Sequence, residues 1–252
     1  MSVLLLGSKG YLGSYIANSI DCDIYPVDRR RLSSNGRQYD YVINCIGKPD
    51  LEYCQINTAE TDYSNWKVVG DIKKYYPNSK IINFSSYYVY DYSGICAEDS
   101  KVTDRYAYCR QKLFSEKENI NGVTFRVGKL FGNKNSKQGK LTDYILSNDV
   151  LNLDGVYFNP CSCKLVTDVI KWEIANKQLR GVYNLANSDF TTHYKYGCFI
   201  NEQLGNRKTI NLVKSIPRTF HNYGYFLMSV EKLNRIVPLP SWKKDIISYI
   251  NS

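Results

Sequence analysis

The sequence begins with a short apolar run, Val3 to Leu6, that leads directly into three evenly spaced glycines, Gly7, Gly10 and Gly13. The apolar run predicts a buried strand, and the glycines predict a tight turn into a helix. This context is typical of folds that bind dinucleotides, although G-x-G-x-x-G is the usual spacing, and the backbone of the turn there approaches a pyrophosphate. The residues expected to hold the cofactor phosphates are Gly7, Ser8, Lys9, Gly10, Tyr11, Leu12 and Gly13.

The chain then alternates between apolar or β-branched runs and helix-like stretches. Helices are expected near residues 12–20, 61–76 and 105–118, and strands near residues 2–6, 23–27, 40–46, 80–84 and 123–127. This alternation predicts an α/β fold, a Rossmann-like doubly wound parallel sheet with a smaller C-terminal lobe. Only residues 29–39 separate the second strand from the third, which is too short for a good crossover helix.

Two strand ends are placed to meet a dinucleotide. The second strand leads into Asp28, Arg29, Arg30 and Arg31. An acid at this place usually binds ribose hydroxyls, and a neighbouring arginine can bind a 2′-phosphate. We therefore expect NADPH as the cofactor, with NADH as the alternative, while a solvated basic turn is the competing interpretation of Arg30 and Arg31. The third strand ends in residues expected to contact the cofactor riboses, Cys45, Ile46 and Gly47.

A later strand-to-helix segment carries side chains suited to proton transfer. The strand near 80–84 is followed by Ser85 and Ser86, and the next helix carries Tyr108 and Lys112 four residues apart. Residues at this spacing share one face of a helix, so the phenol and the ammonium can point into the same cleft. A nearby ammonium lowers the pKa of a phenol, which suits the phenol to proton transfer near neutral pH. The hydroxyl of Ser86 is placed to hold the carbonyl oxygen that receives the proton.

Taken in order, these motifs resemble the extended short-chain dehydrogenase/reductase family, in particular its branch of dTDP-4-dehydrorhamnose reductases and nucleotide-rhamnose synthases. The matching motifs are G-S-K-G-Y-L-G, V-D-R-R, V-I-N-C-I-G, S-S-Y-Y-V-Y from Ser85 and Y-C-R-Q-K-L-F-S-E from Tyr108. The similarity continues through F-R-V-G-K-L-F-G, L-R-G-V-Y-N-L-A-N and the closing L-P-S-W-K-K-D-I-I-S-Y-I, so it covers nearly the whole chain. One departure is Lys67, which stands where the family has a backbone-bracing asparagine.

The resemblance implies a reductase that acts on the C4 ketone of a nucleotide-linked 4-keto-6-deoxy sugar with NADPH. Tyr108 would protonate the developing alkoxide, Lys112 would tune that phenol and bind the ribose, and Ser86 would hydrogen-bond the carbonyl oxygen. Residues 1–128 would form the NADP-binding Rossmann domain, and residues 129–252 mainly the substrate-binding lobe, with strands free to return to the main sheet. The implied substrate-binding residues are Ser86, Tyr87, Tyr88, Lys129, Lys134 and Arg218.

Several alternatives stay open beside this interpretation. Lys129 is equally well read as a surface lysine, and Arg218 as part of a structural salt bridge. A bifunctional 3,5-epimerase/4-reductase would place a cysteine where this chain has Tyr88, although Lys134 lies near the place of its second acid/base. A non-catalytic NADP-binding subunit, like the regulatory subunit of methionine adenosyltransferase, is disfavoured because the residues Ser86, Tyr108 and Lys112 are intact.

The composition argues against two other classes of protein, those that bind nucleic acid and those that span a membrane. The net charge is +9, but the basic residues are dispersed, which argues against nucleic acid and suits a nucleotide-diphosphate sugar. No apolar run approaches the roughly 18 to 20 residues of a membrane helix. No signal peptide is expected, so we expect a cytoplasmic protein without a membrane partner, and a homodimer is allowed.

The numbers of cysteines and histidines limit the chemistry that the chain can carry. Eight cysteines in such a chain predict free thiols rather than a disulfide framework. With only His193 and His221 present, Ser–His or His–metal chemistry is nearly excluded, and no metal site is expected. His193 follows Thr191 and Thr192 at an expected helix start, where a structural role is favoured.

Overall fold

Within the residues that the computed structural model describes (1–25, 32–91, 94–134, 136, 140–214 and 226–251), the central feature is a six-stranded sheet. Its order is β11-β6-β4-β3-β1-β2, and every neighbouring pair is parallel. The strands are β1 (Val3–Leu6), β2 (Asp23–Tyr25), β3 (Tyr41–Asn44), β4 (Lys80–Ser86), β6 (Val123–Val127) and β11 (Gly181–Leu185). The predicted α/β fold with a Rossmann-like, doubly wound sheet is confirmed.

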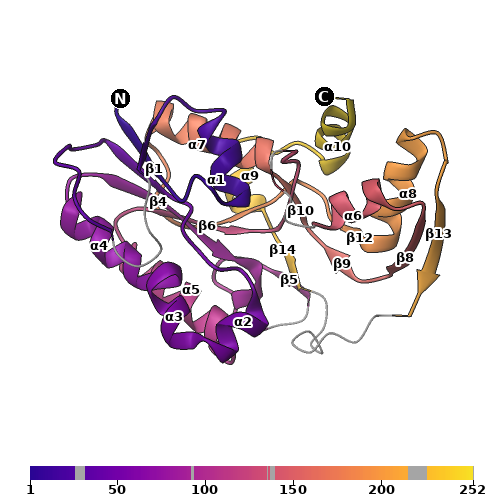
Figure 1. Ribbon diagram of the computed structural model, residues 1–252, viewed down its shortest axis with the longest axis horizontal. Helices are drawn as coiled ribbons and strands as arrows, with labels where there is room; N and C mark the ends of the chain where they lie inside the picture. The colour runs from indigo at the N-terminus through magenta and orange to yellow at the C-terminus, as the bar shows by residue number, and fades with distance from the viewer. Residues whose placement is uncertain (26–31, 92–93, 135, 137–139, 215–225, 252) are drawn as a thin grey trace.

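Helices cover both faces of this sheet (Figure 1). α1 (Tyr11–Ala17) and α7 (Cys163–Asn176) lie on one face, and α4 (Val68–Tyr75) and α5 (Ala107–Glu118) on the other. Alternate residues of a strand point to opposite faces. β1 therefore reads as a continuous apolar run because both of its faces are buried.

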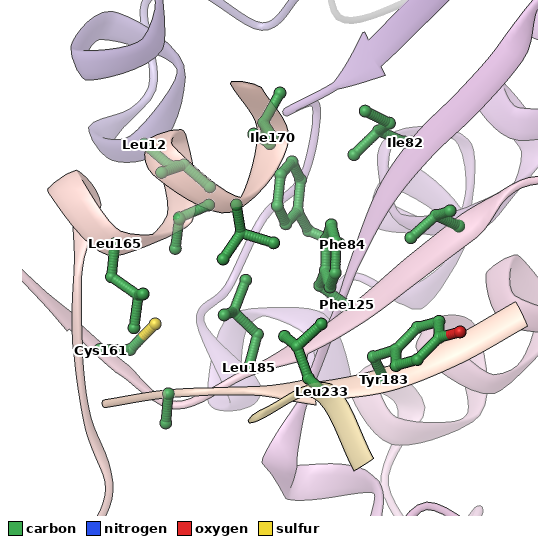
Figure 2. Packing of buried hydrophobic residues seen from close by; sticks show 14 of the residues in the cluster. Leu12, Ile82, Phe84, Phe125, Cys161, Leu165, Ile170, Tyr183, Leu185 and Leu233 are labelled. Carbon is green, nitrogen blue, oxygen red and sulfur yellow. The ribbon is translucent and has the colours of Figure 1, made fainter. Parts of the chain in front are cut away.

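The alternation can be followed in β1. Leu5 belongs to the cluster that contains Ile16 of α1, whereas Leu4 and Leu6 belong to the cluster around Ile72 of α4. Figure 2 shows the first cluster, in which apolar side chains of the α1 and α7 layer pack over the sheet. Its labelled members include Leu12, Leu165, Ile170, Phe84 and Phe125.

The helical region between β3 and β4 is more broken than the expected helix at 61–76. It consists of α2 (Leu51–Ile56), α3 (Thr58–Asp62), a π-helical turn (Tyr63–Lys67) and α4. π-helical turns are rare and are found mostly at functional sites. The other expected helices are present as α1, which ends at Ala17, and α5, which begins at Ala107 because Tyr106 has an extended backbone.

The connection between β2 and β3 is short, as expected. Its described residues, 32–40, contain no helix. This part of the chain therefore passes from the sheet edge back into β3 without a crossover layer of its own.

The C-terminal half adds a smaller lobe made of paired short strands and helices (Figure 1). The pairs are β7 (Lys129–Phe131) with β10 (Pro160–Ser162), β9 (Tyr157–Phe158) with β12 (Thr191–Thr192), β8 (Val150–Asp154) with β13 (Thr209–Val213), and β5 (Gly94–Cys96) with β14 (Phe226–Met228). The helices of this lobe are α6 (Leu141–Ser147), α8 (His193–Gln203) and α10 (Trp242–Asn251), whereas α9 (Glu231–Asn234) packs against β11 of the main sheet. A separate apolar cluster around Phe131, Phe158, Tyr196 and Trp242 forms the core of this lobe.

From the lobe the chain returns to the main sheet. β11 pairs with β6 from Gly181 opposite Val123 to Leu185 opposite Val127, and α7 packs against α1. The sequence allowed for such returning strands, while the division of the chain at residue 128 stays a prediction.

Three further findings bear on function. All eight cysteines are free. In the part of the chain that the structure describes, no helix combines the length and apolarity that a membrane span requires. Among the same residues, no group of three or more His, Cys, Asp and Glu side chains is arranged to hold a metal ion.

Candidate functional site

The predicted site residues gather at the carboxyl edge of the sheet. The glycine turn follows β1, Cys45 follows β3, and Ser86 ends β4. These three strands are adjacent and parallel, so their carboxyl ends meet at one edge. Ligands of open α/β sheets bind at this edge, where the strand order reverses, and here it reverses between β1 and β3.

Gly7 and Gly13 are required by the packing of the turn. Gly7 has φ +78°, and a Cβ there would lie 2.6 Å from the carbonyl carbon of Cys45. A Cβ on Gly13 would overlap the carbonyl oxygen of Gly7. The two glycines thus bring β1, α1 and the end of β3 into direct contact. The expected tight turn is observed, and its role in binding phosphate stays a prediction.

The other residues of the turn differ in what they can offer a ligand. Lys9 is exposed and Ser8 is half-buried. The side chains of Tyr11 and Leu12 are buried in the core, and the Tyr11 hydroxyl accepts a hydrogen bond from the backbone N–H of Asn133 (3.3 Å). Burial raises the pKa of Tyr11. Tyr11 and Leu12 therefore present backbone rather than side chain toward the sheet edge.

Ser86, Tyr108 and Lys112 come together in the interior, with residue exposures of 5%, 5% and 7%. The side chain of Ser86 lies beside the phenol of Tyr108 and acts to lower the pKa of that phenol. The ammonium nitrogen of Lys112 lies 5.8 Å from the centre of the Tyr108 ring and donates to the carbonyl oxygen of Phe84 (3.0 Å). The i, i+4 spacing on α5 therefore places the phenol and the ammonium on one face, as expected.

The protonation of this group departs from the expectation. Burial raises the pKa of Tyr108 above the ordinary phenol value, and the hydrogen bond from Ser86 opposes this only in part. The net shift of this pKa is therefore upward, opposite in direction to the lowering expected from a neighbouring ammonium, because desolvation is the largest cause. Burial also lowers the pKa of Lys112 to about 8.

Ser85 and Ser86 have different partners. Ser85 Oγ donates to Glu116 Oε1 (2.5 Å), whereas Ser86 Oγ accepts from the backbone N–H of Tyr88 (3.2 Å) and caps the short helix η2 (Tyr87–Val89). Because successive strand residues face opposite ways, only one of the two serines can meet Tyr108. The observed orientation agrees with the choice of Ser86, whose catalytic role stays a prediction.

Asn65 is a site residue that the sequence did not reveal. It is 2% exposed, its Oδ1 accepts from the backbone N–H of Lys48 (2.7 Å), and its Nδ2 donates to Gln111 Oε1 (2.7 Å). A Cβ on Gly47 would lie 3.5 Å from Asn65 Oδ1 and 3.4 Å from Lys112 Nζ. Asn65 therefore braces the segment after β3 where that segment lies over Lys112.

Lys67 stands where the resemblance would place the bracing asparagine, a departure that puts this role in doubt at position 67. Lys67 is instead exposed and pairs with Asp62 (3.6 Å). The π-helical turn Tyr63–Lys67 alters the register of the helix, and this turn carries Asn65 inward. An asparagine within one helical turn of position 67 was the only sequence signal that could have identified Asn65. The π-helical turn that carries it inward could not be predicted from the sequence.

Two predicted substrate-side residues, Tyr87 and Tyr88, lie next to Ser86. Their rings pack together with centroids 4.2 Å apart, and the Tyr88 carbonyl accepts from the thiol of Cys109 (3.1 Å). Lys134 is exposed, and its ammonium lies 5.5 Å from the centre of the Tyr249 ring on α10. The expected substrate contacts of these residues stay predictions.

Lys129, at the start of β7, contacts a histidine. Its ammonium nitrogen lies 3.2 Å from His193 Nε2 and 5.5 Å from the centre of the Phe158 ring. His193 opens α8, as expected, and Thr192 caps this helix by accepting from the N–H of Lys195 (3.1 Å).

Four predicted site residues, Asp28, Arg29, Arg30 and Arg218, lie outside the described residues.

Of the residues that follow β3, Ile46 donates its N–H to Asn44 Oδ1 (3.2 Å). Burial raises the pKa of the Cys45 thiol. Their roles in cofactor binding likewise stay predictions.

Lys112 should make stability depend on pH above neutrality. Its pKa in the folded protein, about 8, lies below the ordinary value of 10.5, so between these values the unfolded chain binds more protons. The free energy of unfolding should therefore rise as the pH increases from about 8 to about 10.5, by on the order of 3 kcal/mol relative to Lys112→Met. Urea unfolding of both proteins at about pH 7, 9 and 10 measures the difference. A difference that does not change with pH would contradict the burial of this ammonium.

Comparison with known proteins shows the fold but not a family. No protein-family model matches the sequence, and no curated protein matches it either. Many solved structures do match, at low sequence identity. The dTDP-4-dehydrorhamnose reductase from Clostridium acetobutylicum superposes with a TM-score of 0.84 at 18% identity, over 100% of this chain and 99% of that one.

Two further structures were solved with ligands. The dTDP-4-dehydrorhamnose reductase from Bacillus anthracis, in complex with NADP, has a TM-score of 0.83 at 16% identity, over 100% of this chain and 98% of that one. MoeE5, in complex with UDP-glucuronic acid and NAD, has a TM-score of 0.80 at 13% identity, over 100% and 99%. The chain thus shares its full-length fold with these two dTDP-4-dehydrorhamnose reductases and with MoeE5.

Proposed function

We propose that the protein is an NADPH-dependent reductase of a nucleotide-linked 4-keto-6-deoxy sugar. The observation that carries this proposal is the buried group of Ser86, Tyr108 and Lys112 at the carboxyl edge of the sheet, beside the glycine turn. A phenol and an ammonium removed from water, with shifted pKa values and at the edge where ligands bind, mark a candidate site for proton transfer.

The residues at this edge fit a dinucleotide. Gly7 and Gly13 are fixed by contacts within the protein, whereas a Cβ on Gly10 would meet nothing closer than 3.4 Å. Packing within the chain therefore does not require a glycine at position 10, and close approach of a pyrophosphate to the backbone would. Arg29 and Arg30 would favour NADPH over NADH by pairing with its 2′-phosphate.

The proton chemistry follows from the three buried side chains. The nicotinamide would supply the hydride. Tyr108, whose pKa is raised, keeps its proton at neutral pH and can donate it to the developing alkoxide. Ser86 Oγ would hydrogen-bond the carbonyl oxygen of the substrate. Lys112, mostly protonated at pH 7, would stabilise the phenolate that remains and hydrogen-bond the cofactor ribose.

The comparisons support the substrate class. Similar structures include two named dTDP-4-dehydrorhamnose reductases and one enzyme complexed with a UDP-sugar. On this basis the nucleotide-diphosphate sugar would lie between the carboxyl edge of the sheet and the C-terminal lobe, and the enzyme would act in the cytoplasm. Its expected contacts are Ser86, Tyr87, Tyr88, Lys129, Lys134 and Arg218.

A direct assay tests the proposal. The purified protein should oxidise NADPH when supplied with a 4-keto-6-deoxyhexose linked to dTDP, UDP or GDP, and NMR of the product should show a new hydroxyl-bearing C4. NADH should serve less well. Binding of NADPH without turnover of any of the three substrates would favour a non-catalytic subunit. Failure to bind either cofactor would refute the proposed function.

A further inference from the structure

The C-terminal lobe contains a chain of three ionisable side chains in contact, Asp154, His193 and Lys129, of which the first two are buried and Lys129 is half-buried. Asp154 lies at the end of β8, His193 at the start of α8 and Lys129 at the start of β7. The distance from Asp154 Oδ1 to His193 Nδ1 is 2.6 Å, and the distance from His193 Nε2 to Lys129 Nζ is 3.2 Å. The side chains of His193 and Asp154 are only 4% and 1% exposed.

The chemistry of these groups fixes the proton on the ring. A carboxylate only accepts hydrogen bonds and an ammonium only donates them. His193 must therefore donate from Nδ1 to Asp154, which leaves its Nε2 lone pair to accept from Lys129. A second proton on the ring would place two cationic donors face to face. The ammonium of Lys129 thus opposes a second proton on the ring, while the buried carboxylate orients the ring through Nδ1, and the imidazole in turn holds the ammonium of Lys129.

The backbone of Lys129 lies close to that of Ser86 in the proposed active site. Ser86 is paired in register with Val127, and Lys129 follows Val127 by two residues. With strands about 4.8 Å apart and at most about 3.6 Å per residue, the Cα atoms of Ser86 and Lys129 are within roughly 12 Å of each other. β14 contacts both β9, whose Phe158 lies under the Lys129 ammonium, and η2, which Ser86 caps.

We propose that Lys129 is a specificity-determining residue for the sugar ring of the substrate, and that His193 and Asp154 are positioning residues that hold its ammonium in place. This inference rests on the proposed function for the identity of the ligand. The ammonium would donate to an oxygen substituent of the ring, a hydroxyl or a carboxylate. The sugar is favoured over the diphosphate because the Cα atoms of Lys129 and of Ser86, which would hold the ketone, are within roughly 12 Å of each other.

The hydrogen-bonded chain of Asp154, His193 and Lys129, called the relay below, can be tested without a substrate. The chain has two histidines, so His221→Gln leaves a single imidazole, and ¹⁵N NMR of that ring reports its tautomer and its titration. We expect the proton on Nδ1 at neutral pH. Besides Asp154 and Lys129, the ring faces Phe158 of β9, with centroids 4.9 Å apart. In Lys129→Met the ring should protonate at a higher pH, because a neighbouring cation is removed.

The matched control is Lys195→Met, because Lys195 is exposed on the same helix. This variant should leave the titration of His193 unchanged. A proton on Nε2, or an unchanged titration in Lys129→Met, would overturn the relay. Since the tautomer is measured with Lys129, His193 and Asp154 intact, this result does not depend on whether a variant at any of these three positions folds.

Binding of three nucleotides tests the specificity. Calorimetry with UDP, UDP-glucose and UDP-glucuronic acid should show that Lys129→Met weakens both sugars by about tenfold or more and leaves UDP unchanged, as for the loss of one charge-assisted hydrogen bond. His193→Phe should act in the same direction, and His193→Gln, which keeps an acceptor near Nε2, should restore part of the affinity. A larger loss for UDP-glucuronic acid would identify a carboxylate as the partner.

The contrary outcomes are distinct. An equal loss for UDP would place Lys129 at the nucleotide or diphosphate, and no loss for any probe would remove it from the site; either result overturns the assignment. If the wild-type protein binds none of the three, the proposed function is in doubt and the specificity assignment falls with it. The tautomer of His193 still decides the relay in that case.

Discussion

Replacing Tyr108 with Phe should lower the rate of ketone reduction by on the order of 10² to 10⁴-fold, as expected when a general acid is removed. The phenol is buried beside Ser86, and the centre of its ring lies 5.8 Å from the ammonium nitrogen of Lys112. The substitution removes one oxygen and keeps the ring, so the fold and the affinity for NADPH should be preserved. Stopped-flow measurement of NADPH oxidation with saturating substrate gives the rate.

The matched control is Tyr144→Phe, because Tyr144 lies on α6 with 41% of its surface exposed. It should retain the wild-type rate. Lys112→Met should resemble Tyr108→Phe in rate, but it should also weaken cofactor binding because the ribose loses a donor. A Tyr108→Phe protein that reduces the ketone at the wild-type rate would remove Tyr108 from the mechanism.

The second large effect concerns stability. Glu116→Ala should lower the free energy of unfolding by about 3 to 5 kcal/mol, because it leaves the guanidinium of Arg126 buried without its carboxylate. The two side chains are 6% and 8% exposed, and Arg126 donates from Nε (3.0 Å) and from its second guanidinium nitrogen (2.7 Å) to the two oxygens of Glu116. Ser85 loses its acceptor as well. Urea unfolding followed by circular dichroism measures the change.

Two further proteins make this measurement specific. Glu231→Ala breaks an exposed pair with Arg235, whose side chains are 78% and 76% exposed, and should cost less than about 1 kcal/mol. The double variant Glu116→Leu with Arg126→Met replaces both charges by apolar groups and should be more stable than Glu116→Ala. If Glu116→Ala loses no more than Glu231→Ala, the buried pair does not hold α5 to β6.

Local patterns with a fixed geometry could be predicted from the sequence. The i, i+4 spacing of Tyr108 and Lys112 needs only a helix to bring the two groups together, and α5 provides it. Likewise, the glycine turn needs only a strand before it and a helix after it. The choice between Ser85 and Ser86 followed from the family register, and the strand alternation agrees with it because Ser85 points to Glu116.

Features that depend on tertiary packing could not be predicted. Asn65 reaches Lys48 and Gln111 through a π-helical turn, and such a turn has no sequence signature. The raised pKa of Tyr108 follows from its burial, which the sequence does not show residue by residue. The contact of His193 with Asp154 joins residues 39 positions apart, so it emerges only when β8 and α8 are placed.

The pairing of β11 with β6 has a consequence for the way the chain is made. During synthesis β6 leaves the ribosome long before residues 181–185, so its outer edge has unpaired N–H and C=O groups until β11 follows. Because α7 is also synthesised late, α1 lacks the helix that packs against it until residues 163–176 have been made. An open strand edge can pair with another nascent chain, and long-range pairing is slow. A protein shortened before residue 181 should therefore aggregate, although it would contain the glycine turn and all three buried proton-transfer residues.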